Sequence, residues 1–147
     1  MRVLVTGING QLGHDGALVL KDRGMDVLAP ARSEMDVADK GTVDDYFEKN
    51  SPDAVIHCAA YTAVDKAEDE TDLCRKVNVQ GTGHIADNCS RSDIPMMYIS
   101  TDYVFDGTGD RPWEPSDATS PINAYGLSKR DGETEVLRLE NLGHLLI

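Results

Sequence analysis

The sequence predicts an α/β fold, a doubly wound parallel sheet with helices on both of its faces. Short β-branched or apolar runs alternate along the chain with longer stretches of helical character, and this alternation is typical of parallel sheets. A glycine-rich turn separates the first strand-like run from the first helical stretch. The chain has 147 residues, 40% of them hydrophobic and 27% charged, which is enough for one domain with a hydrophobic core.

The first half of the chain contains three predicted strands and two predicted helices. The strands are short runs rich in Val, Ile and Leu, which fit a pleated, buried surface. The helices are the longer and more polar segments between these runs. In chain order they are strand Arg2–Thr6, helix Gln11–Arg23, strand Asp26–Ala29, helix Lys40–Asn50 and strand Ala54–His57.

The second half continues the alternation with a long helical stretch from Glu70 to Ser92. We expect Gly81 and Gly83 to interrupt this stretch, because Gly is unfavourable inside a helix. Pro95 then introduces a strand at Met96–Ser100.

A loop, a helix and a short apolar run complete the chain. The Thr101–Pro121 loop is long for a compact domain, which favours a substrate-facing role, and Trp113 is expected to pack within it. A helix at Asn123–Glu140 precedes His144–Ile147, which is predicted to open a further strand. Parallel strands are normally buried between neighbours, so we expect a fragment of a longer protein in preference to an edge strand.

The composition argues against several classes of partner. With 26 acidic and 14 basic residues the formal charge is −12, which repels nucleic acid. No apolar run approaches the roughly 20 residues that span a bilayer, so no membrane association is expected. Cys58, Cys74 and Cys89 lack metal-type spacing, and reduced thiols in a cytoplasmic protein are expected. The charge run at residues 65–70 reads as a helix start, not as a metal site.

The glycine-rich turn predicts a dinucleotide site in a Rossmann-type fold. Gly7, Gly10 and Gly13 follow the pattern G-x-x-G-x-x-G directly between a strand and a helix. Such glycines allow a tight turn, a close approach of the backbone to a pyrophosphate and close packing of the helix on the strand. The amino-terminal end of the helix favours the negative charge of the pyrophosphate.

The residues after the second strand bear on which dinucleotide binds. NAD-binding domains usually place an acidic residue there to hold the ribose 2′-hydroxyl, but this sequence reads Ala29-Pro30-Ala31-Arg32. A missing acid and a nearby Arg suit a 2′-phosphate and favour NADPH. Glu34 and Asp36 follow closely, so NADH stays open.

A Tyr/Lys pair supplies the candidate chemistry. Tyr125 and Lys129 share one face of the predicted helix, one turn apart. We expect the Lys129 ammonium to lower the pKa of Tyr125 towards the range of general acid–base catalysis. Thr101 follows the fourth strand and can donate a hydrogen bond to a substrate oxygen. The small residues Cys58–Ala60 leave room for a flat cofactor ring.

These segments together resemble the extended short-chain dehydrogenase/reductases, and among them the dTDP-4-dehydrorhamnose reductase family. The resemblance covers essentially the whole chain. The glycine turn and the Tyr/Lys pair indicate the superfamily, and Tyr61–Glu68 and Ser100–Gly107 are closer to this one family. The matching stretches are Val5–Gly13, His57–Glu68, Asn78–Thr82, Ser100–Gly107 and Tyr125–Lys129.

The resemblance implies a role for each matching position. Thr101, Tyr125 and Lys129 match the catalytic triad, and Asn78 matches a structural Asn that supports the site. The implied cofactor-binding residues are Gly7, Gly10, Gln11, Leu12, Gly13, Arg32, Asp36, Val37, Ala59, Ala60, Tyr61, Tyr125 and Lys129. The implied substrate-binding residues are Thr62, Val64, Thr101, Asp102 and Tyr103. No metal is required, since hydride chemistry belongs to the nicotinamide.

The implied reaction is the NAD(P)H-dependent reduction of the C4 ketone of dTDP-4-dehydro-L-rhamnose. Residues 1–147 would form the NAD(P)-binding domain, with the family's carboxy-terminal sugar-nucleotide-binding domain absent, and a homodimer is a further expectation. Two alternatives stay open: another nucleotide-sugar reductase or epimerase, and a non-catalytic regulatory subunit resembling that of methionine adenosyltransferase. Activity of the 147 residues alone is also left open.

Overall fold

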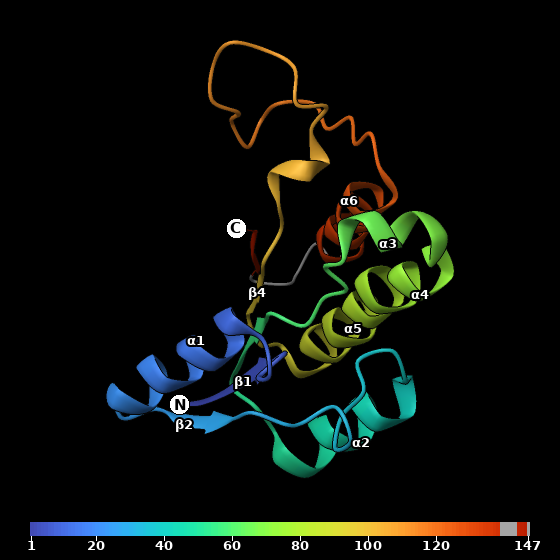
Figure 1. Cartoon of the computed structure of the whole chain (residues 1–147). Helices are drawn as coiled ribbons and strands as arrows, with labels where there is room; N and C mark the ends of the chain where they lie inside the picture. The colour runs from blue at the N-terminus through green and yellow to red at the C-terminus, as the bar shows by residue number, and fades with distance from the viewer. Residues whose placement is uncertain (139–143, 147) are drawn as a thin grey trace.

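A five-stranded parallel sheet forms the centre of the molecule, with strand order β2-β1-β3-β4-β5 (Figure 1). The computed structural model describes residues 1–138 and, for the backbone, residues 144–146. The predicted strands are confirmed, although β2 and β4 are shorter than expected. They are β1 (Arg2–Thr6), β2 (Asp26–Leu28), β3 (Ala54–His57), β4 (Met96–Tyr98) and β5 (His144–Leu146). The predicted extension of the last strand to Ile147 and of the last helix to Glu140 lies outside the described residues.

The register of the sheet sets three side chains in a row at its carboxyl end. Thr6 of β1 is paired with His57 of β3, and His57 is paired in turn with Tyr98 of β4. All three residues are buried. Ligands of open parallel sheets bind at this end, so this row forms the base of any site there.

Helices cover the sheet on both sides. Figure 1 shows α1 on one side, and α2, α5 and α6 on the other. The helices are α1 (Gln11–Asp22), α2 (Lys40–Asn50), α3 (Val64–Asp69), α4 (Thr71–Arg75), α5 (Thr82–Ser92) and α6 (Ala124–Leu137). The expected doubly wound α/β architecture is thus confirmed. In the described part of the chain, no helix is both long and apolar enough to cross a bilayer.

The helical stretch that follows β3 differs from its prediction. Gly81 and Gly83 do not interrupt it, because α4 runs through a π-helical turn at Lys76–Gly81 directly into α5. A Cβ on Gly81 would lie 3.1 Å from Cγ2 of Val37. The glycine therefore serves a close approach between the helix and the segment after β2. The helix start expected at residues 65–70 is found, but it forms a separate short helix, α3, ahead of α4.

The hydrophobic core lies between the sheet and the layer of α2, α5 and α6. It is formed by fully or almost fully buried side chains from all of these elements. Its members include Leu4, Val43, Phe47, Val55, Ile85, Met96, Tyr98 and Val136. The core fixes the helices relative to the strand ends, which is what positions the site.

The segment from Thr101 to Pro121 projects from this body as a long loop (Figure 1). It begins with a 3-10 turn at Asp102–Val104, named η2. The rings of Phe105 and Trp113 stack within it, with centroids 4.6 Å apart and planes inclined by 3°. The expectation that Trp113 packs within its own loop is confirmed.

Candidate functional site

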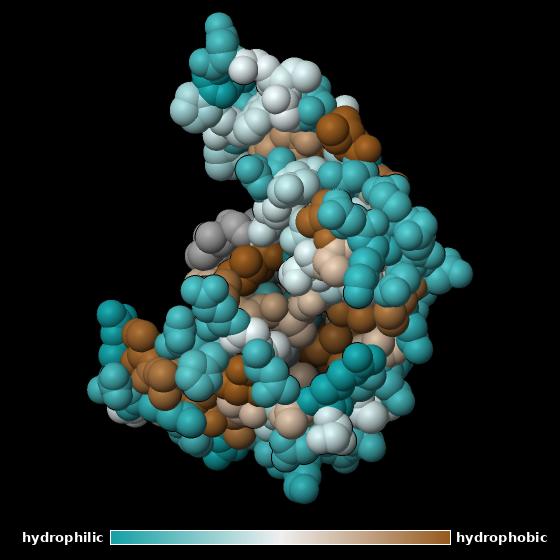
Figure 2. All heavy atoms as spheres, viewed as in Figure 1, coloured by the Kyte–Doolittle hydropathy of each residue, from teal (hydrophilic) through white to brown (hydrophobic). Residues whose placement is uncertain are grey.

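A cavity of about 630 Å³ opens at the carboxyl ends of the strands. Figure 2 shows the corresponding hollow, with apolar residues on its floor, between the α1 side of the molecule and the projecting loop. The lining comes from the β1–α1 turn, the segments after β2, β3 and β4, the helical stretch after Thr71, and α6. The volume lies within the range of ligand sites.

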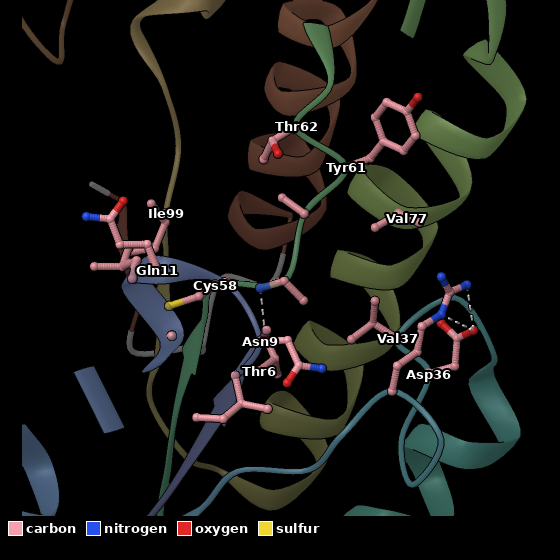
Figure 3. Close-up of a pocket in the computed structure, with 18 of the residues that line it drawn as sticks. Thr6, Asn9, Gln11, Asp36, Val37, Cys58, Tyr61, Thr62, Val77 and Ile99 are labelled. Atoms are coloured by element: carbon pink, nitrogen blue, oxygen red, sulfur yellow. Dashed lines mark hydrogen bonds and ion pairs between the residues drawn. The ribbon is translucent and has the colours of Figure 1, made fainter. Parts of the chain in front are cut away.

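The cavity brings together every residue of the predicted cofactor set. Its lining also includes Thr62 from the predicted substrate set (Figure 3). The members of the cofactor set are Gly7, Gly10, Gln11, Leu12, Gly13, Arg32, Asp36, Val37, Ala59, Ala60, Tyr61, Tyr125 and Lys129.

The glycine turn is held by close backbone contacts that a side chain would block. Gly7 has a φ of 73°, and a Cβ there would lie 2.7 Å from the backbone nitrogen of Ala59. The Gly10 N–H donates to the Gly7 carbonyl over 2.9 Å. No side chain caps the start of α1 at Gln11, and residues 10–13 line the cavity, so the first N–H groups of the helix are available there as donors.

Arg32 and Asp36 form an ion pair at the rim of the cavity. Nε and Nη2 of Arg32 each lie 3.0 Å from Oδ2 of Asp36. Burial raises the pKa of Asp36, but hydrogen bonds from the Ala38 N–H and from Arg32 outweigh this effect and lower it. The Arg32 side chain is 71% exposed, so its guanidinium can reach an anion without being buried.

A neutral histidine lies beneath the cavity. The Thr82 hydroxyl donates to the Asn78 carbonyl over 2.7 Å, so it accepts from Nε2 of His57 at 3.2 Å. Nδ1 of His57 is then the acceptor for the Thr6 hydroxyl at 2.8 Å, and that hydroxyl accepts from the Ala59 N–H at 3.0 Å. Burial lowers the pKa of His57 to about 3. This network ties β1, β3 and α5 together and gives His57 a structural role.

Asn78, in the π-helical turn, holds the backbone of Tyr61 in place. Its Oδ1 accepts from the Tyr61 N–H at 2.7 Å, and its Nδ2 donates to the Tyr61 carbonyl at 3.0 Å. Nδ2 also donates to the Ser128 hydroxyl at 2.9 Å, which donates to the Tyr125 carbonyl. One buried amide thus links two walls of the cavity. The Tyr61 hydroxyl donates to Glu70.

Tyr125 and Lys129 reach the cavity from α6. The helix starts sharply because the Asn123 side chain accepts from the Gly126 N–H at 2.7 Å, a common amino-terminal cap. Lys129 donates from Nζ to the Ile99 carbonyl at 2.6 Å and lies 4.1 Å from the centroid of the Tyr98 ring. Burial lowers its pKa to about 8.

The expected lowering of the Tyr125 pKa by Lys129 is wrong. Burial raises the pKa of Tyr125, and the neighbouring Thr101 hydroxyl opposes this effect only in part. The Lys129 ammonium is directed at the Ile99 carbonyl instead of the phenol. Tyr125 is therefore held as a protonated phenol, a proton donor.

Four residues of the predicted substrate and catalytic sets lie outside the cavity lining, close to Tyr125. The Thr101 hydroxyl caps η2 by accepting from the Tyr103 N–H at 3.3 Å, and it donates to Asp102 at 3.3 Å. The Tyr103 ring packs edge-on against the Tyr125 ring with centroids 5.6 Å apart. Val64 packs in a small apolar cluster with Tyr125.

Several residues that line the cavity were not predicted from the sequence. Leu73 and Val77 come from the helical stretch after α3, and their spacing of four residues was a usable signal of a shared face. Pro30 and Met35 flank the Arg32–Asp36 pair. Other lining residues without a predicted role are Thr6, Ile8, Asn9, Ile99 and Ser100. Within residues 1–138, no cluster of His, Cys, Asp and Glu side chains is suited to a metal ion.

A glycine turn between a strand and a helix, with a cavity at the strand ends, defines a Rossmann-like domain. The chain belongs to the family described as "RmlD substrate binding domain", which matches residues 1–147. It is 40% identical over 146 residues to a dTDP-4-dehydrorhamnose reductase of Streptomyces griseus, covering 99% of this chain and 48% of that protein.

Solved structures agree with this assignment. A dTDP-4-dehydrorhamnose reductase from Clostridium acetobutylicum superposes with a TM-score of 0.95 at 37% identity, over 99% of this chain and 52% of that one. The Bacillus anthracis enzyme in complex with NADP gives a TM-score of 0.94 at 36% identity, over 99% and 51%. The chain thus spans about half the length of these relatives.

Proposed function

We propose that residues 1–147 form the NAD(P)H-binding domain of a reductase that acts on the C4 ketone of dTDP-4-dehydro-L-rhamnose. The observation that carries this proposal is that the glycine turn and the Tyr125/Lys129 pair line one cavity. The names of the relatives supply the substrate, and the NADP complex of the Bacillus anthracis relative supplies the cofactor class.

The residues present fit a dinucleotide. Gly7 and Gly13 let the turn pack closely against the backbone of Ala59 and of Gly7 itself, and the uncapped start of α1 offers donors to a pyrophosphate. Gly10, Gln11 and Leu12 would meet this group, while Asp36 and Val37 would lie along the adenine. Arg32 would bind a 2′-phosphate and favour NADPH over NADH.

The chemistry follows from the protonation states. A bound nicotinamide would supply the hydride. Tyr125, whose pKa burial raises, would donate its proton to the oxygen of the ketone, and Thr101 would donate a hydrogen bond to the same oxygen. Lys129 would hydrogen-bond the nicotinamide ribose. Ala59, Ala60 and Tyr61 would line the nicotinamide, with Thr62, Val64, Asp102 and Tyr103 near the sugar.

A cytoplasmic location and a homodimer are also part of the proposal. Cys58, Cys74 and Cys89 are free thiols, which suits a reducing compartment. Sedimentation equilibrium over a range of concentrations would test the dimer: a single monomer mass throughout contradicts it.

The first test of the proposed function measures whether the chain binds NADPH or NADH. NADPH and NADH are titrated into the chain by calorimetry, with Gly10→Trp as the variant that fills the turn. We expect NADPH to bind and the variant to lose binding. Absence of binding by the unchanged chain would overturn the cofactor assignment.

The second test measures whether the chain catalyses the reduction of the keto-sugar. NADPH oxidation is followed after addition of dTDP-4-dehydro-L-rhamnose. Oxidation that needs this sugar supports the reductase. NADPH binding without oxidation by any nucleotide keto-sugar would instead favour a non-catalytic, cofactor-binding subunit.

A further inference from the structure

Two consecutive turns of α6 hold two consecutive residues of the segment after β4. Lys129 donates from Nζ to the Ile99 carbonyl at 2.6 Å. Ser100 donates from its hydroxyl to Oε1 of Glu133. We refer to these four residues as the α6 clasp. Ser100 and Lys129 both line the cavity, and Thr101 is the next residue of the chain.

The clasp sits on a rigid base. A Cβ on Gly132 would lie 2.6 Å from the Asn78 carbonyl oxygen, so the helix backbone is in close contact with the π-helical turn. The Tyr98 hydroxyl also donates to the Lys129 carbonyl at 3.3 Å. Because the helix cannot move easily relative to β4, the side chains at positions 129 and 133 fix where residues 99 and 100 lie.

The surroundings of Lys129 give Glu133 an electrostatic role as well. Lys129 is 3% exposed and is faced by the Tyr98 ring of β4, the neutral imidazole of His57, and the thiols of Cys58 and Cys74. Burial lowers the Lys129 pKa, and the Glu133 carboxylate, one turn further along α6, opposes this effect. Tyr125 occupies the preceding turn of the helix. Glu133 thus favours the ammonium form, together with the Ile99 carbonyl and the Tyr98 ring that contact Nζ of Lys129.

We propose that Glu133 is a positioning residue of this site. Through Ser100 it fixes the Ile99–Thr101 segment, and through its charge it keeps Lys129 protonated at the cavity wall. The proposal rests on the proposed function for the roles of Lys129 and Thr101 themselves. It adds a residue that touches neither cofactor nor substrate.

Two variants separate the two effects. Glu133→Gln keeps an oxygen that accepts from Ser100 but removes the charge. Ser100→Ala removes the hydrogen bond and keeps the charge. Glu135→Gln is the matched control, because Glu135 lies on the same helix and pairs with Arg138 at the surface. Thermal unfolding of each variant checks that the chain still folds.

The first readout needs no cofactor. The protein is labelled at lysine Cε with carbon-13, the Lys129 signal is assigned with Lys129→Arg, and its shift is followed by NMR from pH 6 to pH 11. We expect the Lys129 pKa to fall in Glu133→Gln and to be unchanged in Glu135→Gln. Equal titration curves in the unchanged chain and Glu133→Gln would overturn the electrostatic part.

The second readout is NADPH affinity. Ser100→Ala is expected to weaken binding about three- to tenfold, as the loss of one positioning hydrogen bond implies, while Glu135→Gln binds normally. Unchanged affinity in Ser100→Ala would overturn the positioning part. If the unchanged chain does not bind NADPH, the proposed function fails, and the Lys129 titration still decides for or against the effect of Glu133.

Discussion

Gly13 is packed directly against the Gly7 carbonyl group, so that a Cβ on Gly13 would lie 2.7 Å from the carbonyl carbon. Gly16 lies on the same helix, and a Cβ there would meet nothing within 4 Å. Of two glycines one turn apart, one is therefore required by packing and the other is not.

This difference predicts opposite effects of the same substitution. Gly13→Ala forces backbone against backbone and should destabilise the chain by about 1–3 kcal/mol, and NADPH affinity should fall with it. Gly16→Ala should stabilise by about 0.4–1 kcal/mol, because Ala restricts the unfolded chain and favours helix. Urea unfolding measures both. Equal stability of the two variants would contradict the packing argument.

His57 should make the stability of the fold depend on pH. Its pKa is lowered to about 3 in the folded chain and is about 6.5 when unfolded. The unfolded state therefore binds an extra proton between these values. The contribution of the neutral His57 to the free energy of unfolding is fully present above pH 6.5. It is lost as the pH falls towards 3, by roughly 1.4 kcal/mol per pH unit.

The control for this effect is His57→Asn, measured by urea unfolding from pH 5 to pH 7. Unfolded carboxyl groups titrate near pH 4, so this window reports mainly on histidines. The variant should be less stable at pH 7 and show a shallower pH slope. A slope identical to that of the unchanged chain would show that His57 is not the group responsible.

Local sequence was sufficient for the strands and for the glycine turn. The short run Arg2–Thr6 is rich in β-branched residues, which favours a strand, and the spacing of the glycines favours a turn at its end. The grouping of the predicted cofactor residues around one cavity followed, because parallel strands bring their carboxyl ends together.

Features that depend on distant contacts could not be predicted in this way. The four-residue spacing of Tyr125 and Lys129 places both on one face, but it does not say where the Lys129 ammonium points. That direction is set by the Ile99 carbonyl and the Tyr98 ring, about thirty residues earlier. The reason for a glycine at position 81 is likewise a distant contact. Val37 packs so closely against the helix that a side chain on residue 81 would collide with it.

Arg32 should select for the 2′-phosphate of NADPH. Arg32→Ala is expected to weaken NADPH binding about tenfold, the scale of a charge-assisted hydrogen bond, and to leave NADH binding nearly unchanged. Because the Arg32 side chain is 71% exposed, the difference in NADPH affinity between the unchanged chain and Arg32→Ala should shrink at high salt. Arg23→Ala is the control, since Arg23 is exposed beyond the end of α1. An equal loss of affinity for NADPH and NADH would mean that Arg32 does not bind the 2′-phosphate.

Tyr125 should be needed for proton transfer and not for cofactor binding. Tyr125→Phe is expected to bind NADPH normally and to reduce the keto-sugar about 10²–10⁴ times more slowly. Tyr46→Phe is the control, because Tyr46 lies on α2 and does not line the cavity.

The pH profile of turnover adds a separate test. The Tyr125 pKa is raised by burial, so the phenol stays protonated at neutral pH, whereas Lys129, with a pKa of about 8, loses its proton first. The rate should therefore fall above about pH 8, and Lys129→Arg should move this fall to higher pH. A fall that stays in place in Lys129→Arg would assign it to another group.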